Sequence, residues 1–277
     1  MSKGVLAEDY KKRGNQEFQN KNYTRAISLY ELAVALDSSN SIYFFNLAES
    51  YSKLNMWKKA MRYSTRALEL KNNYVKALAL NGRSMVELGK YSPTLKDIDE
   101  GIKSLEKARL LCSGQNKKTF EEEIARYLKN AKKIRWLKNH EIITLEGEVL
   151  CDHLANLVKQ EYTNEEEQRK QIELIREKLI PKKPKCSDIP KYLLCKLTGE
   201  IMNDPVITSE GYTYERDKLF KYFEQNEKKD PITKKEIDIN KIYANITIKT
   251  VTNEYLEKEP WAFRSKGDIE DYRIIKC

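Results

Sequence analysis

The chain has 277 residues, a formal net charge of +9 at pH 7 and 34% charged residues, with only 10 Gly and 7 Pro. This length accommodates two domains and a connector, and the abundance of Lys, Glu, Leu and Ala indicates a soluble, helix-rich class. No apolar run approaches the roughly 20 residues of a membrane-spanning helix, so we expect no membrane insertion. The first residues lack the apolar core of a signal peptide, and the five cysteines show no paired spacing. We therefore expect a cytoplasmic protein, with access to the nucleus left open.

The basic residues favour an acidic peptide as the partner. They are spread along predicted helices and interleaved with Glu, without an Arg-rich block or an RNA-binding aromatic motif. This distribution argues against binding to nucleic acid. An acidic peptide accounts better for the positive charge.

The first third of the chain repeats itself with a period of 34 residues. The aligned sets are Gly14, Ala48 and Gly82; Tyr23, Trp57 and Tyr91; Ala26, Ala60 and Thr94; and Ala33, Ala67 and Gly101. Each unit is predicted to be two helices joined by a short turn, as in residues 9–20 and 23–36. Because one unit cannot bury its apolar face alone, three units are expected to stack into a curved array with a concave groove. The third unit is degenerate, since Thr94 and Gly101 replace alanines.

The first helix of each unit is expected to line this groove. Lys11 and Asn15 lie four residues apart on one face of the first unit, Asn46 belongs to the second unit and Lys76 to the third. Two ammonium groups and two amides that converge on one groove favour a ligand carboxylate. The alternative is that both lysines are ordinary solvated side chains.

The middle of the chain is predicted to be a charged helical connector, coiled-coil-like in character. Apolar residues recur at short steps over residues 124–158, and the first part of this pattern is expected to cap the repeat array. The stripe over residues 145–158 suits a helix partner, within the chain or in a second copy. The glutamates at 165–167 are expected to break the connector into two arms, and residues 181–185 form an extended linker.

Residues 189–263 have the pattern of a small α/β domain. Its predicted parts are a loop at 197–205, strands at 206–208 and 212–214 joined by Gly211, a helix at 215–225, a second loop at 230–234 and a helix at 246–258. This is the layout of a RING finger, which needs eight Cys or His ligands for two zinc ions. Since the stretch contains one cysteine, Cys195, and no histidine, we expect no metal and no cofactor. Its loops would instead be held by polar side chains: Thr198, Glu200, Asp204, Glu215, Arg216, Asp230, Thr233 and Asn245.

Three segments of this domain, IPKYLLCKLTGEIMNDPVIT, GYTYER and DPITKK, resemble the U-box ubiquitin ligases. The alternative is a small α/β fold with another role. The resemblance implies a RING-like surface that binds a ubiquitin-conjugating enzyme and holds its thioester-linked ubiquitin near a substrate lysine. No side chain of the ligase would act as a nucleophile, Cys195 included. Asn245 matches a structural Asn of the family that bridges the two loops.

The resemblance also places the contacts with the conjugating enzyme. Leu197 stands in the first loop, Pro231 shapes the groove from the second loop and Tyr243 stands at the groove's edge. Lys234 occupies a position where the family usually has Arg, and Lys cannot form two parallel hydrogen bonds. Gly199 stands where chaperone-associated members carry a phenylalanine. These two departures predict weaker activation or another choice of conjugating enzyme.

The repeat array resembles the tetratricopeptide domains that bind chaperones. These grip the acidic C-terminal tail of cytosolic heat-shock chaperones of the seventy- and ninety-kilodalton classes. Four of the five clamp positions match: Lys11, Asn15, Asn46 and Lys76. The fifth position falls at Leu80, and Arg83 lies one turn further along, where it could substitute only from a different angle. Leu80 and Leu78 are expected to form an apolar pocket for a Val or Ile of the tail.

The order of the parts, with the AKKIRW stretch at 131–136, resembles the chaperone-associated U-box ligases over nearly the whole chain. The implied domains are a repeat array at 1–110, a connector at 111–185, a U-box at 186–264 and a tail at 265–277. The implied function is ubiquitination of chaperone-bound clients in protein quality control, by a homodimer. Two alternatives stay open: a non-enzymatic co-chaperone, and a repeat scaffold for unrelated acidic ligands.

Overall fold

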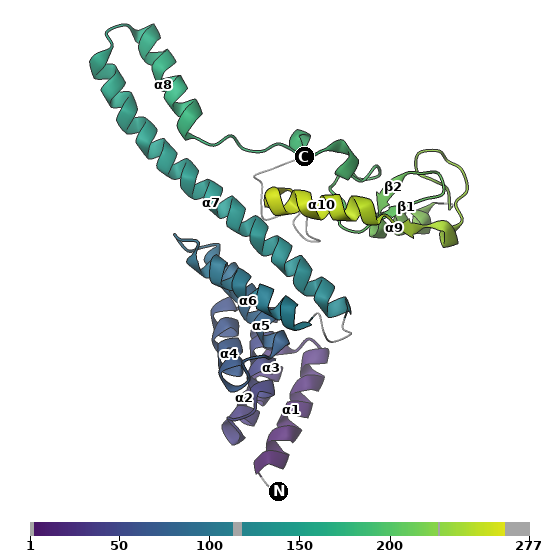
Figure 1. Ribbon diagram of the computed structural model, residues 1–277. Helices are drawn as coiled ribbons and strands as arrows, with labels where there is room; N and C mark the ends of the chain where they lie inside the picture. The colour runs from purple at the N-terminus through teal and green to yellow at the C-terminus, as the bar shows by residue number, and fades with distance from the viewer. Residues whose placement is uncertain (1–2, 113–117, 227, 264–277) are drawn as a thin grey trace. The chain divides into compact units, whose positions relative to one another are not determined.

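The computed structural model describes residues 3–112, 118–226 and 228–263, drawn as ribbons in Figure 1. The chain divides into two compact units, Met1–Asn139 and His140–Cys277. The predicted tail at 265–277 lies outside the described residues. Among the helices within those ranges, none combines the length and the apolar character of a membrane span.

Within the first unit, helices α1 to α6 form three stacked pairs (Figure 1). The pairs are α1 (Lys3–Gln19) with α2 (Tyr23–Leu36), α3 (Ser41–Lys53) with α4 (Trp57–Leu70), and α5 (Val75–Gly89) with α6 (Lys96–Cys112). This confirms the predicted mainly α array of three helical units. The first helix is longer than predicted, because it begins at Lys3 instead of residue 9.

The aligned small residues lie where paired helices cross. Ala26, Ala60 and Ala67 are all fully buried. In the third unit, a Cβ atom on Gly101 would lie 2.7 Å from the carbonyl oxygen of Gly82, and a Cβ on Gly82 would lie 2.6 Å from that of Gly101. The missing alanine therefore reflects a closer approach of two backbones, not a weakened repeat.

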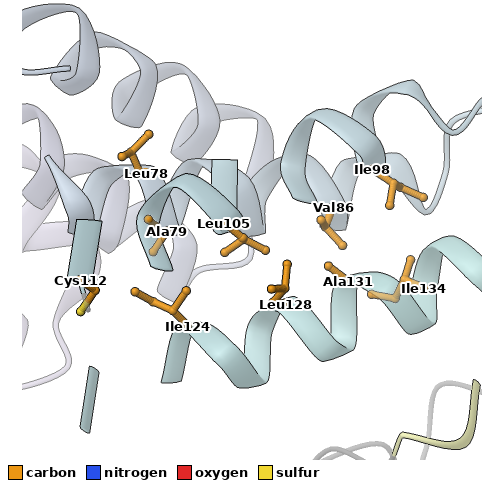
Figure 2. Close-up of a cluster of buried hydrophobic side chains, with 11 residues drawn as sticks. Leu78, Ala79, Val86, Ile98, Leu105, Cys112, Ile124, Leu128, Ala131 and Ile134 are labelled. Carbon is orange, nitrogen blue, oxygen red and sulfur yellow. The ribbon is translucent and has the colours of Figure 1, made fainter. Parts of the chain in front are cut away.

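The long helix α7 (Lys118–Glu161) begins by covering the last pair of the array. Ile124, Leu128, Ala131 and Ile134 of α7 point into one apolar cluster with residues of α5 and α6 (Figure 2). The residues from those two helices are Leu78, Ala79, Val86, Ile98, Leu105, Ala108 and Cys112. The first part of the predicted connector is thus the cap of the array, and the compact unit reaches Asn139.

In the second unit, α8 (Glu165–Leu179) folds back along the end of α7 (Figure 1). The two helices approach closely, since a Cβ on Gly147 would lie 2.8 Å from the carbonyl oxygen of Leu179. The connector thus forms two helical arms, as predicted; they are separated at residues 162–164, and the glutamates at 165–167 open the second arm. Asn164 caps α8 by accepting hydrogen bonds from the amides of Glu166 and Glu167, and acidic residues stabilise a helix N-terminus.

The C-terminal domain is built around a three-stranded antiparallel sheet with the order β2-β1-β3. Its strands are β1 (Pro205–Ile207), β2 (Thr213–Glu215) and β3 (Tyr243–Ala244), and its helices are α9 (Arg216–Gln225) and α10 (Ile246–Lys258). Short 3-10 turns lie at Cys186–Asp188, Lys191–Leu193, Ile239–Lys241 and Pro260–Ala262. Val206 pairs with Tyr214 on one side and Ala244 on the other. The hairpin turn at Gly211, with φ +82°, is as predicted.

Candidate functional site

Two asparagines join the first two units of the array at the predicted groove. The Nδ2 of Asn46 on α3 donates to Oδ1 of Asn15 on α1 at 3.3 Å, and the hydroxyl of Tyr30 donates to the same oxygen at 2.8 Å. Because the carbonyl oxygen of Asn15 accepts both bonds, its side-chain N–H groups are the donors left for a ligand. The structure therefore brings together two of the four predicted clamp residues and orients one of them.

Lys11 is held on the same helix by an ion pair with Glu8. The hydrogen bond from Lys11 lowers the pKa of Glu8, so this carboxylate stays ionised at neutral pH. Glu8 also accepts a hydrogen bond from the Tyr43 hydroxyl at 3.4 Å, which links α1 to α3. A ligand carboxylate at Lys11 would share this ammonium group with Glu8.

Lys76 lies at the start of α5, beside a cleft of about 590 Å³. The other residues that line this cleft are Lys71, Asn73, Tyr74, Val75, Cys112, Thr119, Phe120 and Glu123. Phe120 and Glu123 come from α7, so the helix that caps the array also lines its ligand-sized cavity. Sequence reasoning missed these two residues, because it assigned this segment only a capping role.

The remaining groove candidates differ in their environments. Leu78 is only 5% exposed and belongs to the core between α5, α6 and α7, so its predicted place in a peptide pocket is wrong. Leu80 is half-buried against the apolar cluster that contains Phe44 and Phe45. Since α5 has 3.6 residues per turn, Lys76, Leu80 and Arg83 follow one another along the same face.

Arg83 is fixed between two aromatic rings. Its guanidinium carbon lies 5.0 Å from the ring centre of Trp57 on α4 and 5.0 Å from that of Tyr127 on α7. Its Nη1 donates to the Tyr127 hydroxyl at 3.5 Å. Tyr127 in turn donates to Glu123 at 2.5 Å. Arg83 is thus a positioned cation on the ligand face of α5, and its direction is set by stacking.

One buried carboxylate, Asp230, shapes the second loop of the C-terminal domain. Its Oδ1 accepts from the Tyr214 hydroxyl at 2.9 Å and from the amides of Ile232 and Thr233 at 2.8 and 3.0 Å; its Oδ2 accepts from Thr208 at 3.2 Å. Burial alone would raise the pKa of Asp230, but these hydrogen bonds outweigh it and lower the pKa. The side chain is fully buried. The loop is therefore organised around a charge that four donors satisfy.

A second carboxylate, Glu215, orders the first loop from β2. It accepts hydrogen bonds from the amides of Asn203 at 2.7 Å and Asp204 at 3.1 Å. Burial raises the pKa of Glu215, and these two bonds oppose the shift. Asp204 also forms ion pairs with Arg216 at 2.6 Å and Lys249 at 3.3 Å, which tie the loop to α9 and α10.

Cys195 has a structural environment in the first loop. Its amide donates to the carbonyl of Glu200 at 2.8 Å, and its own carbonyl accepts from the amide of Gly199 at 2.8 Å. Its Sγ accepts from the amide of Glu215 at 3.2 Å, and the residue is 1% exposed. A thiol so placed stabilises the loop and is out of reach of a substrate.

Asn245 joins the sheet to α10. Its Nδ2 donates to the Thr213 hydroxyl at 3.0 Å, its Oδ1 caps α10 by accepting from the amide of Ile248 at 3.1 Å, and its amide donates to the carbonyl of Pro205 at 2.8 Å. Within the described residues, none of its hydrogen bonds reaches the second loop. The predicted bridge between the two loops is therefore wrong, and the residue instead ties β1, β2 and α10 together.

Comparison with known proteins accounts for this combination of parts. The family model described as U-box domain matches residues 189–261. The E3 ubiquitin-protein ligase CHIP of Arabidopsis thaliana is 30% identical over 278 residues, which cover 94% of this chain and 96% of that protein. The chain belongs to the CHIP family of U-box ubiquitin ligases.

Two further similarities cover only part of this chain. Serine/threonine-protein phosphatase 5 of Homo sapiens is 34% identical over 97 residues, which cover 35% of this chain and 19% of the phosphatase. Among solved structures, the second TPR domain of the human RPAP3 protein, in complex with an HSP70 peptide, is 28% identical with a TM-score of 0.39; the match covers 47% of this chain and 95% of that one.

The predicted contact residues of the CHIP-family U-box lie on its loops and on β3. Leu197 and Pro231 are half-buried, one in each loop, and Tyr243 on β3 is 63% exposed. Ile232, beside Pro231, is a further exposed apolar residue that sequence reasoning did not single out. These side chains supply apolar surface on both loops and on the strand between Ile242 and Asn245.

The two U-box residues that were predicted to weaken activation both have left-handed backbones. Gly199 has φ +70° and Lys234 has φ +62°. An ideal Cβ on Gly199 would meet nothing within 4 Å, so backbone conformation, and not space, explains the glycine. The Lys234 amide donates to the carbonyl of Asp230 at 2.9 Å and its side chain is exposed.

Proposed function

We propose that this CHIP-family ligase ubiquitinates clients held by chaperones in the cytoplasm. The repeat groove would bind the acidic C-terminal tail of cytosolic heat-shock chaperones of the seventy- and ninety-kilodalton classes. The U-box would recruit a loaded ubiquitin-conjugating enzyme. The observation that carries the first half is the bonded Asn15–Asn46 pair with Lys11 one turn away on α1. The second half rests on the two loops ordered by the carboxylates of Glu215 and Asp230.

Ligand binding at the groove would be electrostatic. Asn15, Asn46, Lys11 and Lys76 offer donors to carboxylates, and each charge-assisted hydrogen bond contributes about 1.5–3 kcal/mol when partly desolvated. Arg83 supplies a further cation along the same face of α5 as Lys76. Leu80, where the family clamp has its fifth cation, offers an apolar contact.

The ligase itself would act by proximity. The amine of a client lysine attacks the thioester carbonyl of the conjugating enzyme's ubiquitin, an amide bond forms and the enzyme's thiol leaves. The groove holds the chaperone and its client near this thioester, so an intermolecular step gains effective concentration. Cys195 takes no part, since it is buried within the first loop.

The helices α7 and α8 supply a candidate surface for a homodimer. Leu145 and Val149 lie one turn apart on α7 and are 56% and 65% exposed. Leu157, further along α7, and Leu174 of α8 are 59% and 46% exposed. We propose that a second copy covers this apolar stripe. Leu145→Lys with Val149→Lys is expected to give a monomer in light scattering, whereas Lys159→Ala, a change at a polar position of the same helix, should leave a dimer.

The clamp is tested by titrating an acidic chaperone-tail peptide in fluorescence anisotropy. Lys11→Ala and Lys76→Ala should each weaken binding by about tenfold or more, because each removes one charge-assisted contact. Lys58→Ala, on the outer helix α4, is the matched control and should bind as the wild type does. Binding should also weaken as salt is added. Unchanged affinity in both clamp variants, or an affinity that does not depend on salt, would contradict the proposed clamp.

The coupling of chaperone binding to ubiquitin transfer is tested by reconstitution. The mixture contains activating enzyme, a panel of conjugating enzymes, ubiquitin, a chaperone and a misfolded client. The wild type should build chains on the client. Lys11→Ala with Lys76→Ala should retain autoubiquitination and lose the client chains. Tail binding without chains from any conjugating enzyme would select the co-chaperone alternative instead.

A further inference from the structure

Glu49 occupies the groove position of the second repeat that Asn15 and Arg83 occupy in the first and third. The 34-residue period aligns these three residues. On α3, Asn46, Glu49 and Lys53 follow one face at steps of three and four residues, and Asn46 is bonded to Asn15 across the groove. The middle of a groove proposed to bind carboxylates therefore carries a carboxylate.

This carboxylate lacks a direct partner among the described residues. Glu8 pairs with Lys11, and Glu123 accepts from Tyr127, but no described side chain or amide forms a hydrogen bond or ion pair with Glu49. The residue is nevertheless half-buried. Neither oxygen of Glu49 is among the described side-chain atoms that are shut off from water without a partner, so its carboxylate is open to solvent and can accept a hydrogen bond from a ligand.

Several charged and phenolic groups surround Glu49 from the neighbouring elements. Burial raises the pKa of Glu49, Lys53 on α3 and Lys76 on α5 oppose this shift, and Glu123 on α7 adds to it. The negative charge of Glu49 in turn helps to raise the pKa of Tyr30 on α2 and of Tyr74 before α5, each to about 12 after the larger effect of burial. Lys76, Tyr74 and Glu123 also line the 590 Å³ cleft. Glu49 thus acts electrostatically on two residues that line this cleft, Lys76 and Glu123.

We propose that Glu49 selects among acidic tails, favouring those that present a Lys or Arg side chain to it and rejecting those with Asp or Glu at that position. This inference rests on the proposed binding of acidic tails by the groove. A second carboxylate beside Glu49 would add repulsion in a partly dry site, whereas an ammonium or guanidinium group supplies the missing donor. The rings of Tyr74 and Phe120 in the adjoining cleft suit the aliphatic stem of such a side chain.

Lys53 is an internal competitor for the same carboxylate. It lies four residues after Glu49 on α3, an arrangement in which Glu and Lys can pair, although the two form no ion pair in this structure. If a ligand cation replaces it, removal of Lys53 should strengthen the preference for cationic tails. This makes Lys53→Ala a second variant with an opposite expected effect.

The test is a peptide scan on the full-length protein by fluorescence anisotropy. Peptides share one acidic C-terminus and carry Lys or Glu at each upstream position in turn. The wild type should bind the Lys peptide about tenfold more tightly than the Glu peptide at one position. Glu49→Gln should reduce this ratio to about twofold or less, and Lys53→Ala should increase it. Glu69→Gln, which removes an exposed charge from the outer helix of the same repeat, should keep the wild-type ratio.

The outcomes separate this inference from the function on which it rests. Circular dichroism and thermal melting of Glu49→Gln establish that the variant is folded. Tail binding without any preference between Lys and Glu, or a preference that survives Glu49→Gln, overturns the role of Glu49 alone. Failure of the wild type to bind any acidic tail overturns both proposals.

Discussion

The repeat array and the U-box each have an apolar core, but different interactions shape their candidate binding surfaces. In the array, small residues let helices cross closely, and an apolar cluster seals the last pair under α7 (Figure 2). In the U-box, Asp230 and Glu215 hold the loops through hydrogen bonds to backbone amides and hydroxyls. The array should therefore be most sensitive to changes in volume, and the U-box to the loss of single polar atoms.

The largest expected effect comes from removing the charge at the centre of the second loop. Asp230→Ala leaves four donors without their acceptor, which should destabilise the U-box by about 4 kcal/mol or more. Hydrogen exchange followed by mass spectrometry on the full-length protein should show lost protection in U-box peptides alone, and ubiquitin transfer should be abolished. Glu224→Ala, at an exposed position of α9, is the control and should change stability by less than about 0.5 kcal/mol. Lost protection in the array as well would contradict the separation of the two regions.

A smaller effect is expected from one added methyl group in the array. Gly101→Ala places a Cβ against the carbonyl of Gly82 and should destabilise the array by about 1–3 kcal/mol, with less exchange protection in α5 and α6. Gly4→Ala is the matched control, since a Cβ there meets nothing within 4 Å; it should be neutral or slightly stabilising. If Gly101→Ala proved as neutral as Gly4→Ala, the close backbone contact would not matter.

The smallest expected effect is the dependence of U-box stability on pH. The pKa of Asp230 is lowered in the folded domain, so its contribution is complete above the unfolded value of about 3.9 and is lost as the pH falls below about 4. Glu215 acts in the opposite direction, because its raised pKa makes protonation favourable to the fold. Exchange measured between pH 3 and 6 should show U-box protection falling only at the acidic end. Asp230→Asn should remove that fall, and its persistence in this variant would assign the acid sensitivity elsewhere.

Much of the fold could be predicted because its signals are local. The bounds of α2 and α10 agree with the predicted helices at residues 23–36 and 246–258. The period also located the small residues at helix crossings. By contrast, β3 has two residues, both exposed, and pairs with a strand nearly forty residues earlier, so no local pattern marks it. Capping of the array by the first part of the connector was also predicted from its apolar residues, but the array was predicted to end at residue 110, whereas the compact unit reaches Asn139.

The candidate site was predictable in its residue types and less so in its directions. Helical spacing placed Lys11, Asn15, Asn46 and Lys76 correctly on the first helices of the units. It could not tell that Leu78 turns into the core whereas Leu80, two residues later, stays half-buried. Glu49 could have been identified from the sequence, because the shift of 34 residues that aligns the glycines also aligns it with Asn15. The acceptor role of Asp230 needed the structure, because its four donors come from three separate stretches of chain.

Because Arg83 stacks on Trp57, the fluorescence of this tryptophan should depend on whether a ligand occupies the groove. An indole ring under a guanidinium group changes its emission when the cation moves, and here the cation lies 5.0 Å from the ring centre on the face of α5 that carries Lys76. A tail that draws Arg83 toward its carboxylates should therefore alter tryptophan fluorescence without any attached dye. Tryptophan emission would then measure the fraction of protein with a bound tail.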